Sequence, residues 1–125
     1  MTPVVYDAGV LVAADRNVRA VWADHRVRLE SGIVPAVPAP VVAQVSRSRS
    51  QVQLRRLLRG CEVAALTEPM AHAAGELGRA KSKDVVDAAV VQAAASLRAD
   101  VVTGDRGDIT RLIEAAGVSC KIIDI

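Results

Sequence analysis

The sequence predicts an α/β protein whose mainly parallel sheet of four to five strands is flanked by helices. Two observations support this fold class. Short apolar runs alternate along the whole chain with longer segments of helical apolar spacing, which is the pattern of a parallel sheet covered on both faces. A length of 125 residues suits a single compact unit. We therefore expect residues 1–125 to form one domain with one functional centre.

The first third of the chain predicts a strand, two helices and a second strand. Residues 3–7 are an apolar strand, and Gly9 lets the backbone turn tightly into a helix that ends near Asp15. Residues 18–29 keep mostly helical spacing of their apolar positions. Residues 33–38 predict a short strand, and their prolines place it at an edge or an end of the sheet.

The middle of the chain continues the alternation. A helix can start after Pro40, because proline is tolerated in a first turn. A second helical piece is expected over residues 47–59, and residues 62–66 predict a third strand. Thr67 is a suitable cap for the next helix, which runs to about residue 80.

The last third supplies a buried helix and the remaining strands. Residues 84–97 are apolar nearly all round, so this helix is expected inside the protein. Residues 100–103 predict a fourth strand, residues 106–116 a helix, and residues 119–123 a closing strand. No internal repeat or low-complexity tail interrupts the pattern.

Two of the predicted strands end at an aspartate, Asp7 near the start of the chain and Asp105 near its end. Ligands of open α/β sheets bind beyond the carboxyl ends of the strands, so two neighbouring strands would bring both acids into one crevice. Asp87 is a third candidate, because an ionised carboxylate in an apolar helix is costly unless a cation or hydrogen bonds compensate it. Alternatively, Asp87 is a first-turn acid behind Asp84, the expected helix cap.

Asp108 and Thr103 lie beside the second strand end and are candidates for a supporting role. Asp108 is open to three interpretations: a metal ligand, a group that holds a ligand in place, or a first-turn acid of the following helix. Either Asp105 or Asp108 is able to cap that helix. We expect Asp105 to be the ligand because it comes directly after the strand.

Three carboxylates in one crevice repel one another unless a cation joins them. Two of them about 4 Å apart cost about 4 kcal/mol at an effective dielectric of about 20. A divalent ion reverses this cost, and Mg²⁺ or Mn²⁺ prefers oxygen ligands of this kind. The matching chemistry is hydrolysis of a phosphodiester, in which the ion generates the nucleophile and stabilises the charge on the phosphate.

The net charge of +2 does not by itself indicate a nucleic-acid-binding protein, but the arginines are unevenly distributed. Five of them fall within thirteen residues: Arg47, Arg49, Arg55, Arg56 and Arg59. They form either a solvated helix face or a set of phosphate contacts. With 2% aromatic residues the chain has no platform for stacking bases, so any nucleic acid is held by its phosphates and shape.

Other classes of site find no support in the sequence. Two histidines and two cysteines lack the spacing of zinc ligands, and Cys61 and Cys120 are expected to be buried free thiols. The apolar runs are shorter than the roughly 20 residues of a membrane-spanning helix, and no signal peptide is evident. We expect a cytoplasmic protein without a membrane partner.

Four segments together resemble the PIN-domain ribonucleases, and among them the VapC toxins of type II toxin-antitoxin systems. The segments are Tyr6-Asp7-Ala8-Gly9-Val10-Leu11, Pro38-Ala39-Pro40-Val41-Val42-Ala43-Gln44-Val45-Ser46-Arg47, Val86-Asp87-Ala88-Ala89-Val90-Val91 and Val102-Thr103-Gly104-Asp105-Arg106-Gly107-Asp108. The resemblance implies a PIN-like three-layer sandwich, Mg²⁺- or Mn²⁺-dependent endoribonuclease activity, a homodimer, and a VapB-like antitoxin that blocks the site. Asp7, Asp87 and Asp105 match the first, third and fourth acids of the family.

The second acid of the family is a glutamate, and the matching position in this chain is Gln44. Glutamine keeps an oxygen that can bind a metal or a water, but it carries no charge and cannot act as a base. We therefore expect one metal ion rather than two, held by Asp7, Asp87 and Asp105. The alternative is a weakened or inactive module that mainly binds its antitoxin.

The first segment also resembles the haloacid dehalogenase phosphatases. Their second aspartate would fall at Gly9, so this interpretation is disfavoured. Receiver domains are disfavoured because no middle strand ends in an aspartate.

Overall fold

A computed structural model of the chain describes residues 1–81 and 84–125. Its five strands form one all-parallel sheet in the order β3-β2-β1-β4-β5, which confirms the predicted α/β class. The strands are β1 (Val4–Tyr6), β2 (Ala36–Pro38), β3 (Glu62–Ala64), β4 (Asp100–Thr103) and β5 (Ile122–Asp124). The helices are α1 (Ala8–Asp15), α2 (Arg19–Glu30), α3 (Ala39–Val45), α4 (Val52–Arg59), α5 (Glu68–Lys81), α6 (Val85–Leu97) and α7 (Arg106–Ala116).

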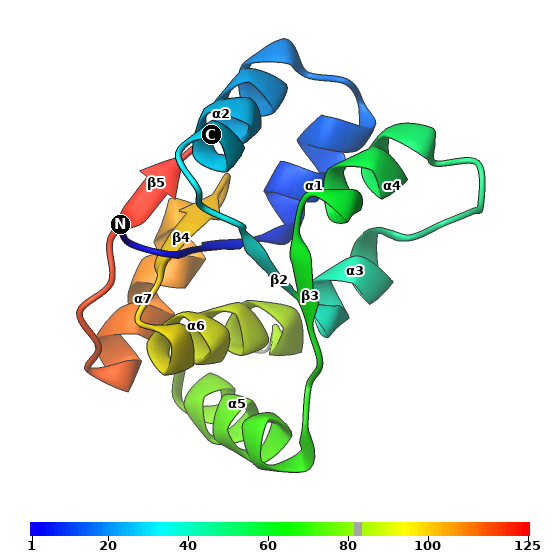
Figure 1. The fold of residues 1–125 in the computed structure, drawn as a ribbon. Coiled ribbons are helices and arrows are strands. Elements are labelled where there is room, and N and C mark those ends of the chain that lie inside the picture. The colour runs from blue at the N-terminus through cyan, green and yellow to red at the C-terminus, as the bar shows by residue number, and fades with distance from the viewer. Residues whose placement is uncertain (82–83) are drawn as a thin grey trace.

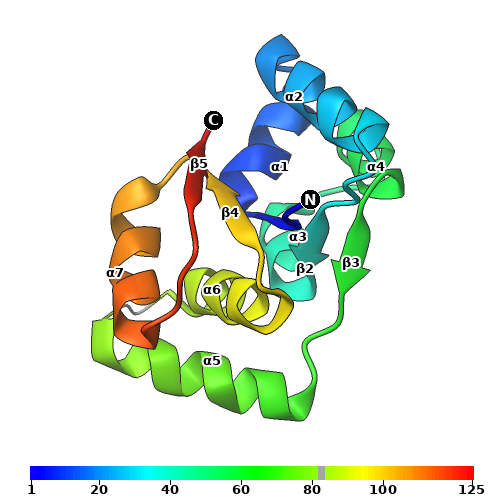
Figure 2. The ribbon, with the colours of Figure 1, turned by 60° about the vertical axis from the view of Figure 1, so that its left-hand side comes forward.

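The helices enclose the sheet from two sides. Figure 1 shows α1, α2 and α4 above the strands and α5, α6 and α7 below them. The turned view of Figure 2 keeps this separation, with α5 outermost beneath α6. Strands that lie far apart in the sequence are neighbours, because β1 pairs with β4 on one side and β2 on the other. From β1 the chain adds β2 and β3 on one side of the sheet and then β4 and β5 on the other. The strand order therefore reverses between β1 and β4, and α/β proteins bind ligands at such a switch point.

Strand β2 is shorter than expected, and it lies inside the sheet rather than at its edge. It pairs with both β1 and β3. Pro35 precedes its first residue and Pro38 is its last, so the prolines, which have no N–H to donate, limit the length of the strand. The expected position at an edge is therefore wrong, because β2 lies between β3 and β1, and its prolines stand instead at the two ends of the strand.

Helix α4 begins at Val52, five residues later than the expected start at residue 47. The intervening loop is held by the side chain of Gln51. Its Oε1 accepts hydrogen bonds from the backbone N–H groups of Arg47 at 2.6 Å and Ser48 at 3.0 Å. Its Nε2 donates to Asp15 Oδ2 of α1 at 3.1 Å. A side chain that takes up the backbone donors competes with helix formation at these positions.

The core follows the predicted apolar positions. Helix α6 has seven buried residues and lies under the sheet, as its uniformly apolar sequence indicates. Thr67 accepts a hydrogen bond from Met70 N at 3.4 Å, as expected of the cap of α5. Cys61 and Cys120 are free thiols, but half-buried rather than fully buried. No helix in the described part of the chain has the length and apolar content to span a membrane.

Candidate metal centre

Asp7 and Thr103 face each other across the centre of the sheet. Strands β1 and β4 are in register at Tyr6 and Val102, and Asp7 N extends the ladder by donating to Val102 O at 3.0 Å. Asp7 is 4% exposed and Thr103 is fully buried, so both side chains are shielded from bulk water. The carboxyl ends of two adjacent strands thus bring together the segments in which the sequence placed its first and last acids.

The Thr103 hydroxyl joins these two segments directly. It donates a hydrogen bond of 2.6 Å to Asp7 Oδ2 and accepts one of 2.9 Å from the backbone N–H of Asp105. The other carboxylate oxygen of Asp7 accepts from Ala8 N at 2.7 Å. One buried hydroxyl therefore orients the Asp7 carboxylate and fixes the start of the turn that carries Asp105.

Asp87 lies in the first turn of α6, close to the other acids at this end of the sheet. The preceding Asp84 caps this helix, since its side chain accepts from the backbone N–H groups of Val86 and Asp87 at 2.9 and 3.1 Å. The cap predicted for Asp84 is thus confirmed, and the Asp87 carboxylate is not needed for capping. Asp87 is 7% exposed.

Burial and neighbouring charge act together on Asp87. Burial is the larger cause, and the negative charges of Asp7, Asp84, Asp105 and Asp108 follow; together they raise the pKa of Asp87 from 3.8 to about 7. A carboxyl group with such a pKa is held in a site that favours the neutral form or a compensating cation. Within residues 1–77 and 84–125, no arginine or lysine forms an ion pair with Asp87.

Asp105 and Asp108 lie at the start of α7. Asp105 occupies the cap position but forms no capping hydrogen bond through its side chain, so its carboxylate is available to a ligand. Asp108 is half-buried, and one of its oxygens lies 3.5 Å from Arg111 Nη1 on the exposed surface. Ion pairs of this exposed kind are weak, so a metal is able to compete for the Asp108 carboxylate.

The three acids Asp87, Asp105 and Asp108 each offer an oxygen atom within 4.8 Å of the others. Oxygens on opposite sides of an octahedral Mg²⁺ lie about 4.2 Å apart, and adjacent ones about 3 Å apart. Small side-chain rotations therefore bring the three oxygens onto one ion. The donor set, three carboxylates with no nitrogen or sulfur, suits Mg²⁺ or Mn²⁺.

Asp7 lies outside this three-oxygen group and next to it. After burial, its charge is the largest single effect on the pKa of Asp87, ahead of those of Asp105 and Asp108. Its carboxylate keeps lone pairs beyond the two that accept hydrogen bonds. The structure thus gathers Asp7, Asp87, Asp105 and Asp108 at one end of the sheet, and the three-oxygen group contains Asp108 where the sequence led us to expect Asp7.

Gln44 lies in a neighbouring hollow rather than among the four acids. This hollow of about 330 Å³ lies between α1 and α3 and is also lined by Ala8, Asp15, Arg16 and Arg47. Ala8 directly follows Asp7, so the hollow opens beside the acidic group. Its one acid, Asp15, accepts the hydrogen bond from Gln51 described above. The hollow therefore offers a metal ion no carboxylate cluster of its own.

The arginines of the predicted cluster separate into two groups. Arg47, Arg49 and Arg55 line a second hollow of about 460 Å³, which shares Arg47 and Gln51 with the first. Arg56 lies on the other side of α4, where its guanidinium carbon is 4.5 Å from the centre of the Trp22 ring. Arg59 lines neither hollow. The segment is thus not one uniform basic face.

Sequence reasoning missed Arg16, which the structure places in the first hollow. The signal was present, because Ala8, Val12 and Arg16 are spaced by four residues and so share one side of α1. It also missed a network between β1 and α2. The Tyr6 hydroxyl and His25 Nδ1 are 2.8 Å apart, and Arg28 Nη1 donates to the same hydroxyl at 3.2 Å.

No protein-family model and no curated protein matches this sequence. Similarity is found among solved structures. A chain in the crystal structure of VapBC2 from Rickettsia felis bound to a DNA fragment from their promoter has a TM-score of 0.74 at 14% identity, with 98% of each chain covered. A chain of the DNA-bound VapBC from Salmonella typhimurium has a TM-score of 0.70 at 14% identity, over 99% of this chain and 98% of that one.

A third similar structure is a toxin-antitoxin complex from Klebsiella pneumoniae. Its matching chain has a TM-score of 0.67 at 15% identity, over 84% of this chain and 88% of that one. The fold is therefore that of chains in toxin-antitoxin complexes, along nearly the whole length. This likeness confirms the expected PIN-like α/β sandwich and, at the level of the fold, the resemblance to VapC.

Proposed function

We propose that the protein is a metal-dependent endoribonuclease of the VapC type, which hydrolyses RNA phosphodiesters at the four-acid crevice. The observation that carries this proposal is the close approach of Asp87, Asp105 and Asp108, with Asp7 beside them, at the switch point of the sheet. Four acids drawn from three separate segments have no structural need to meet, and their repulsion opposes folding. Binding of a divalent cation explains their gathering.

The residues that would hold Mg²⁺ or Mn²⁺ are Asp87 and Asp105, with Asp7 and Asp108 completing the set. When bound, such an ion supplies a nucleophilic water at neutral pH and offsets the charge that develops on the phosphate. Thr103 holds the Asp7 carboxylate in place, and this carboxylate would accept a proton from that water. We propose one ion rather than two, because Gln44 contributes no charge to the neighbouring hollow.

RNA is the substrate that we propose, held through its phosphates by Arg47, Arg49 and Arg55; Arg56, also expected from the sequence to contact phosphates, lies over Trp22 on the other side of α4. The described residues offer two aromatic rings other than histidine, Tyr6, which is fully buried, and Trp22, which is covered by Arg56. Base stacking is therefore not the basis of recognition. Cellular RNA lies in the cytoplasm, where we expect the protein to act.

A protein antitoxin of the VapB type is the partner that we propose, with a homodimer as the assembled form. The support is the fold, since the similar chains belong to toxin-antitoxin complexes. Gln44 favours a second candidate function. If the neutral hollow leaves the centre too weak to hold an ion, the protein is a module that binds its antitoxin without cutting RNA.

Cleavage of total cellular RNA with Mn²⁺ and with Mg²⁺ tests the enzyme. We expect the wild type to cut and Asp7→Asn to lose activity by at least about a hundredfold, as for loss of a group that acts in proton transfer. Asp24→Asn, which removes an exposed acid of α2, is the matched control and should cut normally. Equal cutting by all three proteins would indicate a contaminating nuclease.

Metal titration separates the two candidate functions. Binding of Mn²⁺ to the wild type and its loss in Asp87→Asn are expected of the enzyme. A wild type that neither binds Mn²⁺ nor cuts RNA at millimolar metal would instead be the binding module.

A further inference from the structure

We infer that the hollow around Gln44 is a phosphate subsite, where the RNA backbone leaves the metal centre between Arg16 and Arg47. This inference rests on the proposed RNA substrate and assigns the path that the strand takes. The resemblance to VapC leads one to expect a carboxylate at this position. The chain has instead the uncharged amide of Gln44, in a hollow that Arg16 and Arg47 also line.

The hollow lies beside the group of acids. Ala8 forms part of its wall, and the preceding residue is Asp7, whose carboxylate lies beside the three-oxygen group. A phosphate in the hollow is therefore a near neighbour of a phosphate at the metal. The second hollow continues from the first through the shared residues Arg47 and Gln51 towards Arg49 and Arg55.

The arginines along this path carry uncompensated charge. Within residues 1–77 and 84–125 the arginines in ion pairs are Arg106 and Arg111, each bound to an aspartate of the C-terminal half. Arg16, Arg47, Arg49 and Arg55 form none. The one acid lining either hollow, Asp15, accepts a hydrogen bond from the amide of Gln51. Four unpaired cations beside an acidic crevice suit a polyanion.

The loop that carries Arg47 and Arg49 is organised before any ligand binds. Gln51 ties it to α1 through Asp15, to the end of α3 through Val45 O at 3.2 Å, and to itself through two backbone N–H groups. A loop held by four hydrogen bonds loses little further entropy when it binds. Gln44 adds a side-chain NH₂ group that can donate to a phosphate oxygen, which a glutamate cannot do.

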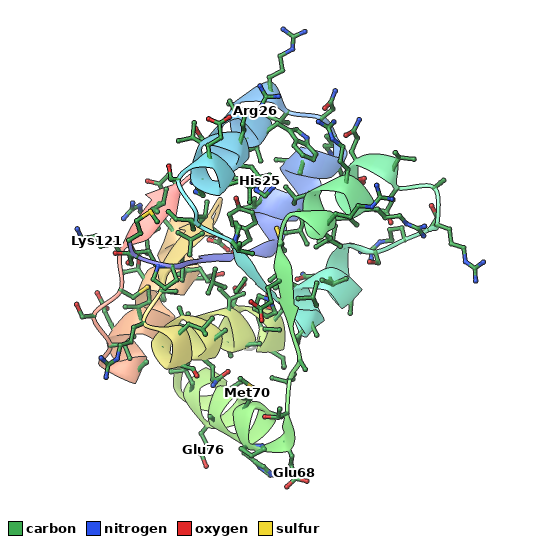
Figure 3. The ribbon with its side chains drawn as sticks, in the orientation of Figure 1. His25, Arg26, Glu68, Met70, Glu76 and Lys121 are labelled. Atoms are coloured by element: carbon green, nitrogen blue, oxygen red, sulfur yellow. The ribbon has the colours of Figure 1, made fainter. Side chains whose placement is uncertain are left out.

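The distribution of charge along the chain agrees with this path. Residues 1–60 contain nine arginines and four acids, whereas residues 61–125 contain ten acids and seven basic residues. Figure 3 shows acids of the second part, Glu68 and Glu76, on the outer side of α5, away from the hollows of the first part. A nucleic acid is thus favoured along α1, α3 and α4 and repelled elsewhere.

Binding of a short fluorescein-labelled single-stranded RNA in EDTA tests the subsite, because no cleavage occurs without metal. Arg16→Gln combined with Arg47→Gln should weaken binding by about tenfold and flatten the salt dependence by about 1.4 in log–log slope, as for two lost phosphate contacts. The matched control combines Arg26→Gln and Arg59→Gln. It removes the same charge from outside both hollows, and Figure 3 shows Arg26 extending from α2 away from them.

The expected result is weakened RNA binding in the double variant Arg16→Gln, Arg47→Gln, called here the hollow variant, and near-normal RNA binding in the control. Equal losses in both would overturn the subsite and indicate a diffuse charge effect, and no loss in either would overturn it as well. Gln44→Glu should also weaken RNA binding several-fold; unchanged binding would show that no phosphate approaches Gln44. Polyglutamate provides a further test. If this peptide binds the wild type, and the double variant Arg16→Gln, Arg47→Gln weakens its binding as much as that of RNA, the phosphate subsite is overturned in favour of a surface for an acidic protein partner.

Failure of the subsite can be told apart from failure of the enzyme. A protein that binds RNA in the hollow but does not cut it with Mn²⁺ keeps the subsite and loses the proposed nuclease. A protein whose hollow variant binds and cuts like the wild type keeps the nuclease and loses the subsite.

Discussion

The Thr103 hydroxyl donates a 2.6 Å hydrogen bond to the Asp7 carboxylate although 96 positions separate the two residues in the chain. Both side chains are buried, and the same hydroxyl accepts from the backbone of Asp105. Because β1 and β4 are adjacent and in register, this bond locks together the two ends of the chain that carry the acids. The geometry of the centre therefore depends on a group that need not bind the metal.

Thr103→Val should damage the centre while keeping the shape of the core. The change removes the donor to the buried Asp7 carboxylate and leaves the part-buried backbone N–H of Asp105 without its partner, so we expect a loss of about 1–3 kcal/mol in the free energy of unfolding. RNA cleavage should fall by more than tenfold. Urea unfolding and cleavage assays measure both effects. Thr103→Ser keeps the hydroxyl and should restore most of the activity; a serine variant as poor as the valine variant would contradict this role.

Asp87→Asn should stabilise the metal-free protein at neutral and higher pH. The folded-state pKa of Asp87 is raised from 3.8 to about 7, so the folded protein binds more protons than the unfolded chain between these values. Stability is therefore lost as pH rises from about 4 to about 7 and stays lost above, by on the order of 2–4 kcal/mol. Asparagine carries no charge and avoids this loss.

Urea unfolding in EDTA, on both sides of pH 7, measures the effect of Asp87→Asn. The variant should exceed the wild type above pH 7 and approach it as the pH falls towards 4. With Mn²⁺ present the order should reverse, because the wild type gains binding energy that the variant lacks. A variant that is less stable than the wild type in EDTA at high pH would contradict the unfavourable ionisation of Asp87 in the folded protein.

Divalent metal should stabilise the folded protein. Replacing each acid should reduce this stabilisation by an amount that depends on how directly the acid binds the metal. A ligand at a hundred times its Kd adds about 2.7 kcal/mol to the free energy of unfolding. We expect Asp105→Asn and Asp108→Asn to reduce the Mn²⁺-induced rise in Tm, with Asp105 the larger because Arg111 already shares the Asp108 carboxylate. Asp24→Asn should leave the rise unchanged. Calorimetric scans with and without Mn²⁺ test this order, which an equal rise in every variant would refute.

Acid should loosen the packing of α2 through His25. This histidine is 3% exposed, and burial first, then the charge of Arg28, lower its pKa below 6.5. The unfolded chain then binds more protons than the folded one, so the stability from neutral His25 is full above about pH 6.5 and is lost as the pH falls below it. The residues around the ring leave little room for relaxation, since a Cβ at Gly60 would lie 3.0 Å from His25 Nε2.

Replacing His25 by glutamine should remove this part of the pH dependence, measured as the Tm between pH 5 and 8. The exposed His72 of α5 provides the control, and His72→Gln should retain the wild-type profile. A wild-type Tm that does not fall below about pH 6.5, or a His72 variant that alters the profile, would exclude His25 as the cause.

The sequence by itself determined the order and type of the elements in the described chain. Apolar runs and helical spacing carry this information locally, so all five strands and all seven helices of the described chain were expected. Boundaries were less accurate where side chains compete with the backbone. Gln51 delays α4, and Pro35 and Pro38 shorten β2, because a captured or missing N–H group ends regular structure.

The candidate acids could also be chosen from the sequence, because a carboxylate at a strand end or in an apolar helix is unusual at any distance from its partners. Their arrangement was decided only by the tertiary structure. Sheet order places β1 against β4, burial of α6 raises the pKa of Asp87, and the packing of α7 against α6 brings Asp105 and Asp108 close to Asp87.

Tertiary packing also decides that Arg16 and Arg47 lie together whereas Arg56 lies apart from them. Arg47 precedes α4 and Arg56 lies within it, and only the packing of this segment against α1 and α2 decides that Arg47 lines the hollow beside Arg16 whereas Arg56 lies over Trp22. Distances between groups far apart in the chain depend on how the elements pack, and no local pattern of residues specifies them.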